Sequence, residues 1–296
     1  MIAIDWGTTS FRAYRLDGDG AVIEKRVAPL GIMQVEQGRF APALQAQIGD
    51  WLASGETRVL MSGMIGSRQG WREAPYVTTP AGADALAEGM VSVPMEHGGL
   101  AWIAPGVCTR DAGGVPDVMR GEETQILGVL DRLPASGAWV CLPGTHSKWV
   151  HVQERRIVGF RTFMTGEVFA VLRTHSILGR MMDDAPPDMA AFDAGLVAGA
   201  ERDLLHQLFG VRARGLFAEL PAERSASYLS GLLIGSELAS LPDEMRRAWL
   251  LGSSELSRLY RYALERKGIV VEGLDQDAVV GGLRTLDRTA QESIRR

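Results

Sequence analysis

The chain carries the same strand–turn–strand pattern twice, and this repeat restricts its possible folds more than any other feature. The first copy is IAIDWGTTSFRAYRL at residues 2–16, and the second is WVCLPGTHSKWVHV at residues 139–152. When the turns are aligned, three pairs of residues are identical: Gly7 and Gly144, Thr8 and Thr145, and Ser10 and Ser147. A further apolar run follows each copy, so each predicts three successive strands. Repetition of a whole unit indicates an internal duplication, and we expect two similar lobes.

The remaining segments alternate between helical and extended patterns. Hydrophobic spacing predicts helices at 40–53, 121–130, 166–178, 190–209, 224–241, 255–267 and from about 277. Short strands are predicted at 58–63, 248–251 and 269–272, and Gly-rich loops at 63–76 and 105–116. We therefore predict an α/β protein with mixed sheets flanked by helices. The two lobes would span 1–133 and 134–296, and the lack of a low-complexity linker favours close packing around a cleft.

Composition argues against several classes of function. The 296 residues carry a net charge of −5, which disfavours a general binder of nucleic acid or of anionic membranes. No apolar run approaches the ~20 residues that span a bilayer, and an acidic start at Asp5 is unlike a secretory signal. Two cysteines do not make a disulfide framework, and the five histidines lack metal-ligand spacing. We expect a cytoplasmic protein.

Both turns have the chemistry to bind phosphate. Glycine has no Cβ, so backbone N–H groups can approach an anion closely, and neighbouring hydroxyls add donors. The predicted nucleotide-binding residues are Gly7, Thr8, Thr9 and Ser10 in the first turn and Gly144, Thr145, His146, Ser147 and Lys148 in the second. Either turn alone is also compatible with an ordinary β-turn. The chain has no P-loop motif and no G-x-G-x-x-G after a strand, so we expect neither a P-loop NTPase nor a Rossmann dehydrogenase.

The two turns differ at one position that has a chemical consequence. The first copy has Asp5 where the second has Leu142. A carboxylate beside a phosphate is repulsive unless a cation lies between them, and Mg²⁺ readily bridges carboxylate and phosphate oxygens. We therefore predict that Asp5 is a metal ligand and that the ligand of the site is a magnesium nucleotide.

This arrangement resembles the superfamily of sugar kinases, hexokinase, Hsp70 and actin. In that superfamily two ribonuclease H-like lobes bind ATP in a central cleft, with one phosphate loop in each lobe. The segment AWLLGSSELSRLYRYAL at residues 248–264 is similar to the superfamily's adenosine segment, with Gly252 and Ser253 in its turn. The resemblance implies ATP as cofactor and an actin-like ATPase fold.

Longer motifs narrow the resemblance to one family. GMIGSRQGW, DVMRGEETQILG, CLPGTHSKW and MTGEVFAVLRTHSIL, together with the opening segment, look like the 2-dehydro-3-deoxygalactonokinase family. The likeness runs in order to about Leu286, nearly the whole chain. It implies phosphorylation of the 6-hydroxyl of 2-dehydro-3-deoxy-D-galactonate by ATP in the galactonate branch of galactose catabolism.

The implied substrate is a small acid with a keto group and several hydroxyls, and the loop 63–76 has side chains that suit it. Arg68 could hold the carboxylate, with Arg72 as the alternative anchor. Gln69 could bond hydroxyls, and Trp71 could cover an apolar face. Equally, these side chains could simply pack at the surface. Glu167, at the start of the helix that Thr165 and Gly166 open, is a second-rank contact, because an acid there also suits a helix N-terminus.

Phosphoryl transfer needs a carboxylate that takes the proton of the acceptor hydroxyl. Related sugar kinases place an acid after a glycine at the start of a helix, and this position carries Glu122 here. Asp117 and Asp111, just upstream, are rival candidates. Glu122 and Glu123 could instead compensate the helix dipole, with Arg120 pairing with Glu123 or steadying the phosphoryl group.

Other functions stay open at the level of sequence. The acceptor could be another keto-deoxy acid or a neutral sugar, or the chain could be an ATP-driven switch of the actin or chaperone kind. A cysteine hydrolase using Cys141 and His146 fits least, because Cys141 lies within an apolar strand. The sequence does not fix the oligomeric state, and it is compatible with a homodimer.

Overall fold

The computed structural model describes every residue except 37, 202, 253, 276 and 296. Its contacts group the chain into two units. Unit 1 comprises Met1–Ala138, Val150–Arg161 and Leu274–Arg296, and unit 2 comprises Trp139–Trp149 and Thr162–Gly273. This grouping differs from the continuous halves 1–133 and 134–296 that the sequence suggested. In the described residues, no helix is long and apolar enough to cross a membrane.

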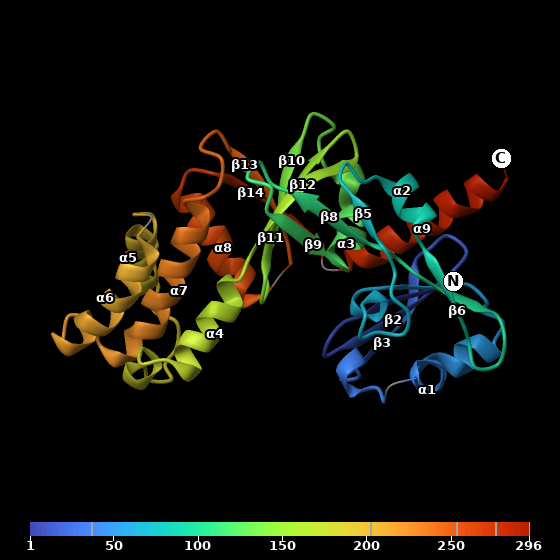
Figure 1. Cartoon of the computed structure of the whole chain (residues 1–296), viewed down its shortest axis with the longest axis horizontal. Helices are drawn as coiled ribbons and strands as arrows, with labels where there is room; N and C mark the ends of the chain where they lie inside the picture. The colour runs from blue at the N-terminus through green and yellow to red at the C-terminus, as the bar shows by residue number, and fades with distance from the viewer. Residues whose placement is uncertain (37, 202, 253, 276, 296) are drawn as a thin grey trace. The chain divides into compact units, whose positions relative to one another are not determined.

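Unit 1 is built on a six-stranded mixed sheet (Figure 1). Its order is β3 (Val22–Ala28), β2 (Phe11–Leu16), β1 (Ile2–Trp6), β4 (Val59–Ser62), β7 (Leu100–Ile103) and β6 (Val91–Pro94). β1 pairs antiparallel with β2 and parallel with β4, and the hairpin β2–β3 is antiparallel. The predicted strands at the start of the chain and at 58–63 are thus confirmed.

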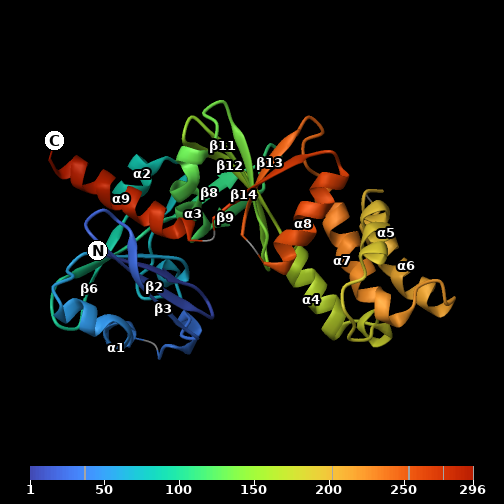
Figure 2. The same ribbon diagram turned by 180° about the vertical axis from the view of Figure 1, so that it is seen from behind.

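The two faces of this sheet carry different helices (Figures 1 and 2). Ile2, Ile4 and Trp6 alternate along β1 and pack into one core with helix α1 (Phe40–Ala53), which matches its predicted bounds. Side chains alternate across a strand, so Asp5 belongs to the opposite face. Helices α3 (Glu122–Val129) and α9 (Ala278–Ile294) contact each other in unit 1, and α9 also contacts β1.

The close packing of α9 on α3 explains why the end of the chain groups with unit 1. A Cβ added at Gly282 would lie 1.8 Å from the backbone oxygen of Thr124, so only glycine permits this approach. The short helix α2 (Ala83–Glu88) also contacts α9. These contacts place α9 with unit 1.

A small sheet corrects the predicted loop at 105–116. It consists of β5 (Tyr76–Thr78), β8 (Gly106–Arg110) and β9 (Pro116–Met119), with β8 and β9 antiparallel. Asp111 closes the turn between β8 and β9, because its carboxylate accepts the N–H of Val115 at 2.9 Å. The Gly- and Pro-rich composition therefore marks a hairpin with one tight turn rather than an irregular loop.

The second main sheet reproduces the strand order of the first. Its order is β12 (Arg156–Phe163), β11 (Ser147–Gln153), β10 (Ala138–Leu142), β13 (Arg247–Leu251) and β14 (Val270–Leu274). β10 corresponds to β1, and it pairs parallel with β13 as β1 does with β4. The repeat is confirmed, and so is the predicted α/β class with mixed sheets flanked by helices.

Unit 2 contains five α-helices, counted over its described residues. They are α4 (Thr165–His175), α5 (Met189–Gly199), α6 (Leu204–Leu216), α7 (Ala222–Leu238) and α8 (Glu255–Arg266). α5 and α6 both contact α7, as Figures 1 and 2 show. The single helix predicted at 190–209 is wrong: α5 ends at Gly199, and α6 starts at Leu204 as a separate helix.

Candidate active site

The first turn has the tight geometry that its sequence predicts. The N–H of Gly7 donates to the backbone oxygen of Ser10 at 2.9 Å and closes the turn. The backbone of Gly31 packs closely against the backbone of Thr8: a Cβ added at Gly31 would lie only 2.1 Å from the oxygen of Thr8. Thr8 and Thr9 are exposed. The turn therefore presents two hydroxyls to solvent on a fixed backbone.

Asp5 lies directly before this turn, at the end of β1. Its Oδ2 accepts a hydrogen bond from Arg12 Nη1 at 3.1 Å, and its side chain is 16% exposed. Burial raises the pKa of Asp5; Arg12 opposes this shift, and the negative charge of Glu122 adds to it. Asp5 and Glu122 are thus close enough to interact although they are far apart in the sequence.

Two glycines bring these acids together. Gly63, which follows β4, has a φ of +96°, and a Cβ there would lie 2.8 Å from the oxygen of Trp6 and 3.3 Å from Asp5 Oδ1. Gly121 precedes α3, and a Cβ on it would lie 3.2 Å from the Cα of Gly63. The end of β1, the end of β4 and the start of α3 therefore meet at Gly63.

The two acids that open α3 have different surroundings. The backbone N–H of Arg120 donates to Glu122 Oε2 at 3.2 Å, and Glu122 is half-buried. Glu123 is buried, and it accepts the N–H of Gly121 at 2.6 Å and the hydroxyl of Thr124 at 2.9 Å. Burial, followed by the charge of Glu122, raises the pKa of Glu123 to about 7. Glu122 is therefore the acid of this pair with access to a ligand.

The rival acids occupy the small sheet. Asp117 lies in β9, where its carboxylate accepts the N–H of Val118 at 2.8 Å. Asp111 forms the turn of the β8–β9 hairpin. Glu122, by contrast, lies near enough to Asp5 for its negative charge to raise the pKa of Asp5. The geometry of unit 1 thus favours Glu122 as the candidate base.

The loop 63–76 holds its predicted substrate residues in different ways. Arg68 Nε pairs with Glu73 at 3.0 Å, and the Arg68 side chain is 86% exposed. Gln69 is also exposed. Arg72 Nη1 donates to the backbone oxygen of Ser92 at 2.6 Å. Both arginines are exposed, and they differ in their partners: Arg68 pairs with a side chain, whereas Arg72 bonds the backbone.

Trp71 has the packing role that the sequence left as an alternative, and Arg120 has one that the sequence did not reveal. Trp71 stacks on Phe40, with 6.3 Å between ring centroids, and packs against the core of α1. Arg120 is buried, lies over the ring of Tyr76 at 4.3 Å and donates to the oxygen of Ala74 at 2.8 Å. Both side chains hold the loop against unit 1.

The second turn divides into an exposed and a buried part. Thr145 and His146 are exposed, whereas Ser147 and Lys148 are buried at the start of β11. The hydroxyl of Ser147 donates to Glu237 at 2.8 Å. The proton of this hydroxyl is thus directed to Glu237, and nucleotide binding by Ser147 stays a prediction.

The start of α4 packs directly on this turn. A Cβ on Gly166 would lie 2.6 Å from the backbone oxygen of Gly144, so the close contact requires glycine here. The N–H of Glu167 donates to the oxygen of Thr145 at 2.9 Å, and its carboxylate bonds His146 Nε2. Glu167, predicted to contact substrate, thus lies beside a residue predicted to contact nucleotide.

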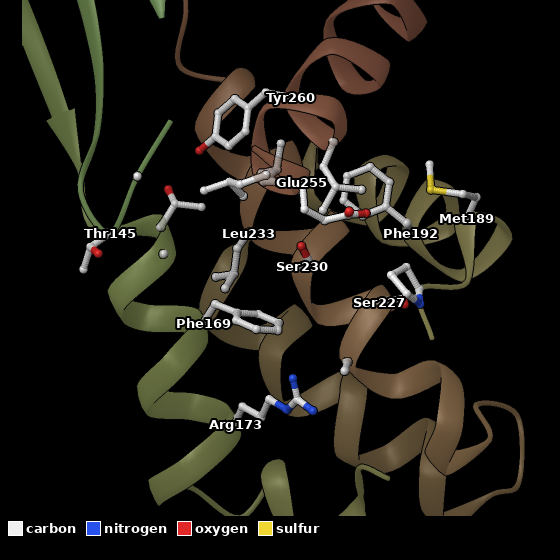
Figure 3. Close-up of a pocket in the computed structure, with 18 of the residues that line it drawn as sticks. Thr145, Phe169, Arg173, Met189, Phe192, Ser227, Ser230, Leu233, Glu255 and Tyr260 are labelled. Atoms are coloured by element: carbon white, nitrogen blue, oxygen red, sulfur yellow. The ribbon is translucent and has the colours of Figure 1, made fainter. Parts of the chain in front are cut away.

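A pocket of about 490 Å³ opens beside the second turn, within unit 2 (Figure 3). Gly144 and Thr145 lie at one end, together with Thr165 and Gly166 of α4. Its apolar walls come from four helices: Phe169 of α4, Met189 and Phe192 of α5, Leu233 and Ile234 of α7, and Leu256, Leu259 and Tyr260 of α8. Arg173, Ser227, Ser230 and Glu255 add polar atoms. This size and lining suit a ligand with a flat apolar part and a polar end.

The predicted adenosine segment contributes one wall of this pocket. α8 follows Gly252, which has a φ of +128° and marks a turn that favours glycine. Ser254 caps α8 by accepting the N–H of Ser257 at 3.2 Å. Within this segment, the first residue that lines the pocket is Glu255. Ser253, which was predicted to bind nucleotide, lies outside the described residues.

Sequence reasoning missed most of the pocket walls and the buried acid beneath them. Phe169, Phe192 and Leu233 belong to helices that are separated in sequence, and each reads as an ordinary core residue. Glu237 of α7 reads as a surface acid in the sequence, yet it is 3% exposed. The one available signal was its position between apolar residues in the stretch LLIGSELASL.

Comparison with known proteins assigns the chain to a family. The family model described as 2-keto-3-deoxy-galactonokinase matches residues 5–286. A probable 2-dehydro-3-deoxygalactonokinase of Rhizobium meliloti (strain 1021) is 39% identical over 295 residues, covering 97% of this chain and 96% of the relative. The 2-dehydro-3-deoxygalactonokinase of Escherichia coli (strain K12) is 37% identical over 290 residues, 96% of each chain.

A solved structure agrees with these relatives. The crystal structure of a candidate 2-dehydro-3-deoxygalactonokinase from Sinorhizobium meliloti matches with a TM-score of 0.87 and 38% identity, covering 97% of this chain and 95% of that chain. The resemblance drawn from the motifs is confirmed. The chain belongs to the 2-keto-3-deoxy-galactonokinase family.

Proposed function

We propose that the chain is an ATP- and Mg²⁺-dependent kinase that phosphorylates the 6-hydroxyl of 2-dehydro-3-deoxy-D-galactonate. One observation carries the proposal: relatives named for this activity are 39% and 37% identical over nearly their whole length. The geometry of each unit gives a physical role to the residues involved. The expectation that both turns hold the phosphates of one ATP stays a prediction.

The pocket of unit 2 is the proposed nucleotide site. Apolar side chains such as Phe169 and Leu256 would cover the base and ribose, which have little charge. Gly144 and Thr145 would meet the phosphates with backbone N–H and hydroxyl donors. The N-terminus of α4, which starts at Thr165, adds a positive dipole at the same end of the pocket.

Asp5 is the proposed ligand of the magnesium ion. Its carboxylate is largely buried beside the charge of Glu122, and both effects raise the pKa of Asp5. This environment fits a bound divalent cation, which would offset the repulsion between the two acids. Mg²⁺, when bound, supplies charge that neutralises phosphate oxygens. Arg12 is 46% exposed and can turn to solvent when Asp5 takes its ligand.

Glu122 is the proposed general base. It would accept the proton of the 6-hydroxyl as the bond between that oxygen and the γ-phosphorus forms. The bond between the γ-phosphorus and the bridging oxygen breaks in the same step, and ADP leaves with that electron pair. Glu123 cannot take this role from its position in the structure, because both of its oxygens accept bonds inside the protein.

Arg68 is the proposed anchor for the carboxylate of the substrate. Its present ion pair with Glu73 is exposed on both sides, and such pairs contribute only ~0–1 kcal/mol. Exchange of Glu73 for a substrate carboxylate therefore costs little. Arg72 is less suited because its guanidinium already bonds the backbone at Ser92.

A coupled assay of ADP release tests the proposal. The purified chain with Mg²⁺ and ATP should turn over 2-dehydro-3-deoxygalactonate with a higher kcat/KM than its gluconate epimer. The R68Q variant should show a raised KM for the acid and an unchanged KM for ATP. Because the Arg68 side chain is exposed, its replacement should not disturb the packing of the protein. A higher kcat/KM for another acid would show that the proposed substrate is wrong. ADP release at full rate without any acceptor would favour the ATP-driven switch.

A further inference from the structure

A buried carboxylate joins the parts of unit 2 that surround the pocket. Glu237 of α7 is 3% exposed and accepts four hydrogen bonds. Its Oε1 accepts from Trp149 Nε1 at 2.7 Å. Its Oε2 accepts from the hydroxyls of Ser147 at 2.8 Å and Tyr260 at 2.7 Å, and also from the hydroxyl of Thr165. Three helices and one strand thus meet at one side chain.

The donors come from segments that line or adjoin the pocket. Ser147 ends the second turn, whose Gly144 and Thr145 line the pocket. Thr165 opens α4, and both Thr165 and Tyr260 line the pocket themselves. Figure 3 shows Thr145 on one side and Tyr260 at the top of the same pocket. A change at Glu237 would therefore reach the turn, α4 and α8 together.

The arrangement is costly unless each bond is made. A buried carboxylate that lacks donors is strongly destabilising, whereas replacing a buried acid and its donors together by apolar groups of similar shape is often neutral or stabilising. The neighbours of Glu237 on α7, Ile234 and Leu238, are apolar and pack in the core of unit 2. An apolar side chain in place of Glu237 would therefore suit this part of the helix. Stability alone thus does not require an acid here. Directional hydrogen bonds, by contrast, fix positions in a way that apolar contacts do not.

We propose that Glu237 is a positioning residue for the nucleotide. It holds the second turn, the N-terminus of α4 and the Tyr260 wall at the spacing that one ATP molecule requires. This inference rests on the proposed function, and it adds a residue that does not itself touch the ligand. The direct contact of Gly166 with Gly144 transmits the position of α4 to the turn.

The variant E237Q tests the proposal with the size of the side chain unchanged. The amide oxygen can accept from Trp149, which only donates, and the amide nitrogen then faces three hydroxyls. With two N–H groups the amide serves at most two of these hydroxyls, so at least one loses its partner. Because hydroxyls can accept as well as donate, the variant should fold. We expect the Kd and KM for ATP to rise about tenfold, the effect of one charged hydrogen bond, with the KM for the sugar acid changed less than about twofold.

Asp193 supplies a matched control in the same unit. It lies on α5 and bonds Arg266 Nε at 2.7 Å and the hydroxyl of Tyr262 at 3.2 Å, both on α8, and it lies outside the residues lining the 490 Å³ pocket. D193N should lower the melting temperature and leave the KM for ATP unchanged. If E237Q folds with unchanged ATP constants, the proposal is overturned. An equal rise of the ATP constants in D193N and E237Q overturns it as well.

Two further measurements keep the test decisive. If E237Q fails to fold, S147A and Y260F each remove one donor, and unchanged ATP constants in both would refute the positioning role. Direct titration of the wild type with ATP, without an acceptor, separates this proposal from the proposed function. Nucleotide binding without sugar-acid turnover would refute the proposed function. The positioning role of Glu237 would then be tested by the Kd for ATP alone.

Discussion

Buried Glu123, at the start of α3, should make the stability of the chain depend on pH. Its side chain is 1% exposed, and its pKa is raised from the ordinary 4.5 to about 7, first by burial and then by the charge of Glu122. Two hydrogen bonds, from the N–H of Gly121 and the hydroxyl of Thr124, oppose this shift without cancelling it. The carboxyl therefore keeps its proton in the folded chain at a pH where the unfolded chain has lost it.

The sign of the pH dependence follows from this difference. Between pH 4.5 and about 7 the folded state binds more protons than the unfolded state, so the free energy of unfolding falls as pH rises. At ~1.4 kcal/mol per pH unit, this interval corresponds to about 3 kcal/mol. The stabilisation is complete below pH 4.5 and lost above about pH 7.

The variant E123Q isolates this effect. Glutamine does not titrate, and its amide can accept from Gly121 and donate to the oxygen of Thr124, so the fold should persist. Urea unfolding of both proteins from pH 4.5 to 8 gives the free-energy difference at each pH. We expect the wild type to lose about 3 kcal/mol relative to the variant across the range. Asp5, whose pKa is also raised, is present in both proteins and cancels. Parallel curves would refute the reasoning.

Four more variants test the site. G166A places a Cβ 2.6 Å from the oxygen of Gly144, so the KM for ATP should rise in steady-state assays, and an unchanged KM would contradict the close contact. E122Q should lower kcat by about 10²–10⁴-fold while D117N stays near wild type; the reverse pattern would move the base to Asp117. D5N should abolish turnover with an unchanged circular dichroism spectrum, and near-normal activity would remove its metal role.

Local patterns predicted the elements well where one short segment determines the structure. The helix at 40–53 has its apolar residues on one face and is bounded as expected. The turns at 7–10 and 144–147 were found because Gly, Thr and Ser recur in the same order between strands. Both observations depend on neighbours in the chain, and hydrophobic period and turn chemistry report on those neighbours.

Features that depend on distant contacts were missed. The hairpin of β8 and β9 is anchored by the parallel pairing of β8 with β5, about 30 residues away, and its Gly-rich sequence resembles a loop. Trp71 packs on Phe40, although its place in a polar loop suggested a ligand contact. Ser147 bonds Glu237, which is 90 residues away, so no local signal could reveal this bond.

The identity of the reaction product tests the central claim most directly. After incubation with Mg²⁺, ATP and 2-dehydro-3-deoxygalactonate, the product's ³¹P resonance should appear as a triplet without proton decoupling. Only a phosphate ester on C6 is attached to a carbon bearing two protons, and one ADP should form for each ester. A doublet, which denotes a carbon with one proton, or ADP formed without any new ester would contradict the proposed function.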